Sequence, residues 1–320
     1  MPERMKEYDF STCKLCQHPG NTIGYRLQRA NVYVCSQCGF HYTDYLDEEY
    51  APISAHSEQT EQLDPKAVNY IREKLESNAG RFQLQEQTVL RYIPDGATLL
   101  DVGFGGGIFL RRMREKGFDC YGIELDRQYL LYAREHLQMQ QVESIPVQDA
   151  YWQEQYKGFF KVIVLWDVLE HVNFPRELVQ AAVQLLQPGG YLFIDTPCRD
   201  ALYHRSGEWM SRISGGRFNG LLNLMYSNHR FGHKQIFSKK DMQTLFGQAG
   251  LEMASLQQFH EMSFPYLFYL RKITTNQGLL KILEPMARFF FSLVPVKNKM
   301  MVVGRRGDEC LPLTVDSPPL

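Results

Sequence analysis

The chain has 320 residues, with 35 Lys and Arg against 36 Asp and Glu and a formal net charge of −1. This length accommodates one large domain plus a smaller unit, and a balanced charge without a basic tract argues against a nucleic-acid partner. No apolar run approaches the ~20 residues of a membrane span, and the first residues lack the apolar core of a signal peptide. We therefore expect a cytoplasmic protein whose cysteines bind metal rather than form disulfides.

Four cysteines form two C-x-x-C pairs near the N-terminus, Cys13 with Cys16 and Cys35 with Cys38. The spacing of the pairs is typical of a closed zinc site with four thiolate ligands, which is structural because it leaves no open position. A piece of about forty residues buries little apolar surface and needs such a staple to fold. We predict a zinc ribbon over residues 1–43, with a chance pair of motifs or a redox pair as the alternative.

A glycine-rich turn follows the apolar segment Leu99–Val102. The spacing of Gly103, Gly105 and Gly107 fits neither the G-x-G-x-x-G dinucleotide fingerprint nor a P-loop, which requires Gly-Lys-Ser/Thr. Glycines permit positive φ and a close approach of backbone to ligand, and the following helix points its N-terminal N–H groups at that ligand. Asp101, just before the turn, would repel a pyrophosphate but suits a cationic or amine-bearing ligand.

Acidic residues end the next three apolar segments. Glu124 lies at about the twenty-residue distance at which α/β folds place a ribose-binding carboxylate. A helix N-cap or a solvated strand end is the alternative for Glu124, but Asp126 is better placed for that cap. Asp149 ends the segment 145–150, where we expect the third strand, and Asp167 ends a buried strand.

In order and spacing, residues 85–197 resemble the motif series of small-molecule, class I S-adenosylmethionine-dependent methyltransferases, from the first motif through the fifth strand. The resemblance implies an α/β fold, with a Rossmann-like, seven-stranded, mostly parallel sheet and helices on both faces, beside the small N-terminal zinc ribbon. It also implies S-adenosylmethionine as cofactor, with Asp149 accepting from the adenine amino group or serving only in a turn. The expected cofactor-binding residues are Asp101, Gly103, Gly105, Gly107, Glu124, Asp149 and Asp167.

We expect a linker over residues 44–64, a methyltransferase domain over 65–307 with insertions at about 198–236 and 263–296, and a tail over 308–320. The first insertion is rich in Gly, aromatic residues and His, which favours a functional loop or lid over core. The second is apolar but too short to span a bilayer. It could cover a hydrophobic acceptor, form a homodimer face or dock on a membrane surface. A helical hairpin packed on the core is the alternative.

Because the methyl group of the cofactor sulfonium is already activated, the enzyme must align the acceptor and remove its proton. Histidine suits that proton transfer because its pKa lies near neutrality. The candidate bases are His171, after the fourth strand, and His229 and His233 in the first insertion. The fourth strand is not followed by the Asn/Asp-Pro-Pro-aromatic motif of N-methylating members, which favours an oxygen or carbon acceptor.

These features predict a methyltransferase for a small-molecule acceptor, for example a sugar-containing or lipid-linked biosynthetic intermediate. Two alternatives remain open at this stage. One is a ribosomal RNA methyltransferase in which the ribbon grips RNA, although its basic residues are few. The other is a non-catalytic module that binds S-adenosylmethionine without turnover.

Overall fold

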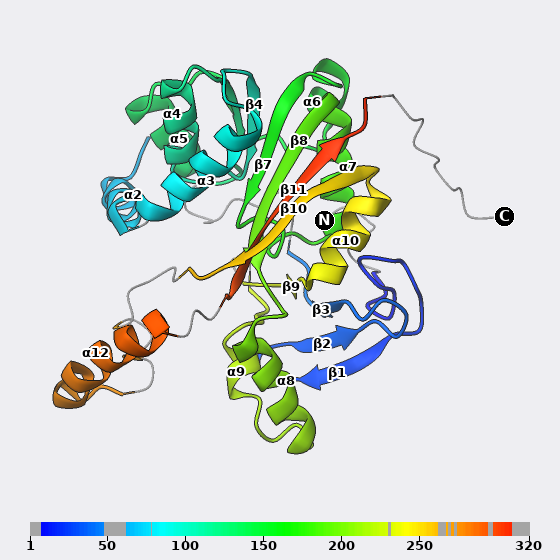
Figure 1. Ribbon diagram of the computed structural model, residues 1–320, viewed down its shortest axis with the longest axis vertical. Helices are drawn as coiled ribbons and strands as arrows, with labels where there is room; N and C mark the ends of the chain where they lie inside the picture. Colours follow the sequence, from blue (N-terminus) through cyan, green and yellow to red (C-terminus); the bar gives the residue numbers. More distant parts are fainter. Residues whose placement is uncertain are drawn as a thin grey trace.

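Two β-sheets organise the chain in the computed structural model (Figure 1). A seven-stranded sheet with helices on both faces forms the larger unit, and a four-stranded antiparallel sheet lies near one end of it. The structure describes residues 8–47, 62–77, 79–229, 232–261, 267, 270–271, 274–293 and 297–308. Most of the expected linker and nearly all of the expected tail therefore lie outside the described residues.

The large sheet has the strand order β10-β11-β8-β7-β4-β5-β6. Only β11 runs antiparallel to its neighbours, so the predicted mostly parallel, seven-stranded sheet is confirmed. Most residues of its central strands are apolar and buried, because helices cover both faces. The strands are β4 (Thr98–Val102), β5 (Asp119–Ile123), β6 (Val142–Glu143), β7 (Phe160–Trp166), β8 (Leu186–Pro197), β10 (Leu251–Phe259) and β11 (Lys299–Arg306).

The third strand lies earlier in the chain than predicted. We expected it within residues 145–150, but β6 pairs at Val142 and Glu143 with β5. Pro146 has no N–H to donate to a ladder, which disfavours a strand through that position. Asp149 instead caps the following helix.

Helices cover the sheet in two groups (Figure 1). Asp126 caps α5 by accepting from the backbone N–H of Gln128 at 2.8 Å, as predicted. Ser238 and Asp241 form the predicted capping box of α10. The first group is α2 (Pro65–Ser77), α3 (Ala79–Tyr92), α4 (Ile108–Glu115) and α5 (Arg127–His136), and the second is α6 (Ala150–Gln155), α7 (Pro175–Leu185) and α10 (Lys239–Gln248).

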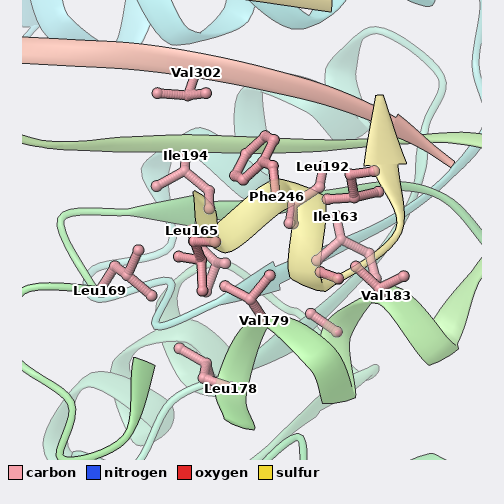
Figure 2. Close-up of a cluster of buried hydrophobic side chains, with 14 of the residues drawn as sticks. Ile163, Leu165, Leu169, Leu178, Val179, Val183, Leu192, Ile194, Phe246 and Val302 are labelled. Carbon is pink, nitrogen blue, oxygen red and sulfur yellow. The ribbon is translucent and has the colours of Figure 1, made fainter. Parts of the chain in front are cut away.

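On the face of the sheet covered by α7 and α10, a cluster of buried apolar side chains packs against the central strands (Figure 2). Ile163 and Leu165 of β7 and Ile194 of β8 are fully buried against Val179 of α7 and Phe246 of α10. Burying each such side chain stabilises the fold by roughly 1.5–3 kcal/mol. This packing fixes the carboxyl ends of β7 and β8, where open α/β sheets bind their ligands.

The fourth strand of the N-terminal sheet comes from a segment much later in the chain. Its order is β1-β2-β3-β9, and β9 comes from the first insertion. Arg199 donates to the carbonyl of Gly39 at 2.6 Å, and Lys234 pairs with Asp47 at 2.6 Å. The N-terminal unit is therefore built into the larger one. Its strands are β1 (Thr22–Arg26), β2 (Asn31–Val34), β3 (His41–Thr43) and β9 (Gln235–Ile236).

The two insertions contain helices. The first forms α8 (Leu202–Ile213) and α9 (Gly220–Asn223), which lie beside the N-terminal sheet, whereas α12 (Gln277–Leu293) stands away from the large sheet (Figure 1). α12 leaves Ile282, Met286 and Phe289 exposed. Among the helices that the structure describes, none has both the length and the apolar character needed to cross a membrane.

Candidate functional site

The glycine-rich turn joins β4 to α4 and holds its three glycines in left-handed conformations. Gly103, Gly105 and Gly107 have φ values of +79°, +54° and +72°. A Cβ atom on Gly103 would come within 2.7 Å of Val168, and one on Gly107 within 2.9 Å of Leu137. Beside Gly105 no atom lies within 4 Å of such a Cβ. The turn therefore needs glycine throughout and borders open space at Gly105.

Glu124 faces this turn from the end of β5. Its Oε2 accepts from the backbone N–H of Gly105 at 2.7 Å, and its Oε1 accepts from that of Asp126 at 2.8 Å. Burial raises the pKa of the Glu124 carboxyl to about 7. The structure thus brings the predicted ribose-binding carboxylate onto the glycine turn, and Asp126 serves as the helix cap.

Asp101 lies beneath the turn with its side chain almost fully buried. The residue is 1% exposed, and Oδ1 has no hydrogen-bond partner among the described residues. Burial raises the pKa of this carboxyl, and the nearby carboxylates of Glu124 and Asp195 raise it further. A buried carboxyl oxygen without a partner is costly unless a ligand satisfies it. Three acidic side chains, Asp101, Glu124 and Asp195, lie close together here, which favours a positively charged ligand.

Asp167, at the end of β7, is held in a buried ion-pair network. Arg81 of α3 pairs with its Oδ2 at 2.7 Å, and the Lys299 ammonium contacts its Oδ1. The two cations also approach Asp195, at 3.4 and 3.7 Å, and Glu261, at 3.5 and 3.3 Å. Burial alone would raise the pKa of Asp167. The positive charges of Lys299, which has the larger effect, and Arg81 outweigh it and hold this pKa well below its usual range.

Sequence reasoning missed four members of this network, Arg81, Asp195, Glu261 and Lys299, because they come from separate segments of the chain. The available signals were Asp195, a charged residue within the apolar part of β8, and Lys299, a charged residue at the start of β11. The side chain of Gln85 adds a hydrogen bond to Asp195 at 3.0 Å.

Asp149 is exposed and acts as the N-cap of α6. Its Oδ1 accepts from the backbone N–H of Tyr151 at 2.9 Å. Of the two roles expected from the sequence, the geometry shows the turn and cap role. Its role toward an adenine amino group stays a prediction.

Two of the three candidate histidines lie together at the carboxyl edge of the sheet. The rings of His171 and His233 are 5.1 Å apart between centroids, next to the buried carboxylate of Glu170. Burial, followed by the proximity of His233, lowers the pKa of His171 to about 3, so its ring is neutral at neutral pH. His229 is exposed and is not part of this group.

The four N-terminal cysteines converge on one point. Their sulfur atoms lie within 4.8 Å of one another, with 3.7 Å from Cys13 to Cys38 and 3.5 Å from Cys16 to Cys35. Tetrahedral zinc with ligands at ~2.3 Å places sulfurs about 3.8 Å apart. Backbone N–H groups point at the sulfurs of Cys13 and Cys35 at 3.4 Å. The geometry of the donor set fits zinc.

Comparison with known proteins assigns the chain to a family. A family model described as "Methyltransferase domain" matches residues 72–256, more than half of the chain. The ubiquinone biosynthesis O-methyltransferase of Cronobacter sakazakii is 34% identical over 125 residues, which are 38% of this chain and 49% of the relative. That of Acinetobacter baylyi is 28% identical over 204 residues, which are 62% of this chain and 75% of the relative.

The chain spans about half of the length of the Cronobacter relative and about three-fifths of the length of a further one from Pectobacterium atrosepticum. A methyltransferase structure from Archaeoglobus fulgidus, described as dependent on S-adenosylmethionine, covers 72% of this chain and 98% of its own, with 16% identity and a TM-score of 0.45. That structural likeness is too distant to bear on function. The match to the family model is decisive, and the chain belongs to the methyltransferase domain family.

Proposed function

We propose that this protein transfers a methyl group from S-adenosylmethionine to a hydroxyl oxygen of a small-molecule acceptor. The observation that carries the proposal is the carboxylate of Glu124 on the left-handed glycine turn, 2.7 Å from the Gly105 nitrogen. A carboxylate at this position, beside the open space at Gly105, suits the binding of a ribose. The sequence relatives are O-methyltransferases, which supports an oxygen acceptor.

When bound, S-adenosylmethionine supplies a methyl group on a positively charged sulfur that is ready to leave. The residues of this chain supply binding and alignment. The carboxyls of Asp101 and Glu124 favour a cationic ligand over an anionic one, and Gly105 lets that ligand approach the backbone closely. The ion-pair network around Asp167 lies at the same edge of the sheet.

We place the acceptor hydroxyl at Glu170, His171 and His233. Burial lowers the pKa of both imidazoles, which favours the neutral form that can accept a hydrogen bond from an O–H group or take up its proton. The position after the fourth strand is where open α/β sheets place ligands.

We further propose that Cys13, Cys16, Cys35 and Cys38 hold a structural zinc ion in a reducing, cytoplasmic setting. The zinc would fix the ribbon that pairs with β9, two residues after His233. This integration favours a role of the ribbon in shaping the acceptor site over a role in gripping RNA.

The test is methyl transfer from S-adenosylmethionine labelled on its methyl group to a panel of phenols, catechols, sugars and ribosomal RNA. The proposal expects label in an O-methylated small molecule, with turnover reduced at least tenfold in Glu124→Gln. Glu143→Gln is the matched control, because Glu143 lies on the neighbouring strand and pairs with Arg134 at the surface. Label found only in RNA, or no transfer by a folded protein, would overturn the proposal.

A further inference from the structure

The geometry points to a divalent metal site made by Glu170, His171 and His233 at the carboxyl edge of the large sheet, separate from the four cysteines. One ligand atom from each residue lies within 4.8 Å of the others. The role we give the metal rests on the proposed function, but the site itself follows from the arrangement of these three side chains.

Backbone carbonyls fix which nitrogen of each imidazole is free. The Nδ1 of His171 lies 3.2 Å from the carbonyl oxygen of Gly232, and the Nδ1 of His233 lies 3.1 Å from that of Met225. A carbonyl oxygen only accepts, so each Nδ1 carries the proton and each Nε2 carries a lone pair. A histidine that donates its second N–H to a carbonyl is typical of a metal ligand, because this bond fixes the tautomer and the ring orientation.

Glu170 supplies a buried carboxylate oxygen that the protein leaves without a hydrogen bond. The residue is 1% exposed; Oε2 accepts from the hydroxyl of Thr196 at 2.9 Å, while Oε1 has no hydrogen-bond partner among the described residues. The nearest histidine nitrogen, Nε2 of His171, is 3.9 Å from Oε1. A cation among the three groups would satisfy this oxygen, which otherwise costs free energy.

The donor set indicates the kind of metal. Two imidazole nitrogens and one carboxylate oxygen suit Zn²⁺, Co²⁺, Fe²⁺ or Mn²⁺ better than Ca²⁺ or Mg²⁺, which prefer oxygen ligands. Three protein ligands leave coordination positions for water or substrate, as in catalytic rather than structural sites. The His171 side chain is 31% exposed, so the open positions face solvent on that side.

A metal here would bind the acceptor through its hydroxyl oxygen and lower the pKa of that hydroxyl. In the transfer the O–H bond breaks and its proton passes to solvent. The oxygen forms a bond to the methyl carbon, and the carbon–sulfur bond breaks with its electron pair going to sulfur. His171 and His233 then serve as ligands rather than as bases.

The experiment is a titration of the full chain, loaded with zinc at the cysteines, with Co²⁺ followed by absorbance. Cobalt bound by nitrogen and oxygen gives weak visible bands, whereas cobalt at the cysteines adds an intense near-ultraviolet band from sulfur. We expect one Co²⁺ per chain without the sulfur band. Glu170→Gln and His233→Gln should each weaken Co²⁺ binding about tenfold or more.

His136→Gln is the control, because it removes an exposed histidine from α5 and should leave Co²⁺ binding unchanged. Calorimetry with S-adenosylmethionine on the same samples shows that each variant is folded and tests the proposed function separately. Cobalt appearing only with the sulfur band, or bound equally well by both site variants, overturns the metal site even if S-adenosylmethionine binds. Cobalt binding without S-adenosylmethionine binding supports the metal site and refutes the proposed function.

Discussion

The partly buried carboxyl of Glu124 makes stability depend on pH in a way that one substitution should remove. Burial raises its pKa from 4.5 to about 7. Below pH 4.5 the carboxyl is protonated in both the folded and the unfolded state. As pH rises toward 7 the unfolded chain loses this proton first, so the free energy of unfolding falls, and above pH 7 the full cost is present.

The size of this effect follows from the two pKa values. A rise from 4.5 to about 7 corresponds to about 3 kcal/mol, at about 1.4 kcal/mol per pH unit. Between pH 5 and pH 8.5, Glu124 should therefore remove about 2.5 kcal/mol of stability from the wild-type protein. Glu124→Gln lacks this proton equilibrium, so its stability relative to wild type should improve by that amount over the same interval.

Urea unfolding at pH 5 and pH 8.5, followed by circular dichroism, measures this difference. Titration of groups that do not interact with Glu124 is shared by the two proteins and cancels in the comparison, whereas Asp101 lies close enough to Glu124 to contribute to the difference. Glu143→Gln is the control for the loss of a carboxylate as such, because the Glu143 side chain is 37% exposed on the neighbouring strand. A difference between Glu124→Gln and wild type that is the same at both pH values would refute the reasoning.

Three further predictions follow from the site. Gly105→Ala should lower the free energy of unfolding by about 1–2 kcal/mol, because alanine disfavours φ of +54°. It should also weaken S-adenosylmethionine binding in calorimetry, and unchanged affinity would contradict the role of the turn. Asp195→Asn should lower the free energy of unfolding by about 3–5 kcal/mol, because it breaks a buried ion network. Its control is Asp308→Asn, where an exposed carboxylate pairs with Arg305 and a much smaller loss is expected because solvent screens the pair. Similar losses for the two variants in urea unfolding would argue against the network. Cys35→Ser should lose zinc in metal analysis while Cys120→Ser keeps it, and zinc retained by Cys35→Ser would exclude the four-thiolate site.

Much of the fold could be predicted because its signals are local. The strand, turn and helix around Gly103–Gly107 all lie within residues 98–115, and the capping box lies within residues 238–241. Such features depend on φ preferences and hydrogen bonds between near neighbours. The glycine turn, Glu124 and the cysteine cluster were therefore recognisable without coordinates.

The remainder depends on contacts between distant segments. The pairing of β9 with β3 joins residues nearly two hundred positions apart, and a two-residue strand has no periodicity to detect. The network of Asp167 draws on α3, β8 and β11 and on Glu261, which follows β10. The convergence of His171 with His233, and the exclusion of His229, also required the folded arrangement of the first insertion.

The most direct test of the account is calorimetric titration of the zinc-loaded chain with S-adenosylmethionine, beside Glu124→Ala. We predict one molecule bound per chain, with affinity at least tenfold lower in the variant, because the ribose loses its charged hydrogen-bond acceptor. No binding by a folded wild-type protein, or equal affinity in the two proteins, would contradict the account.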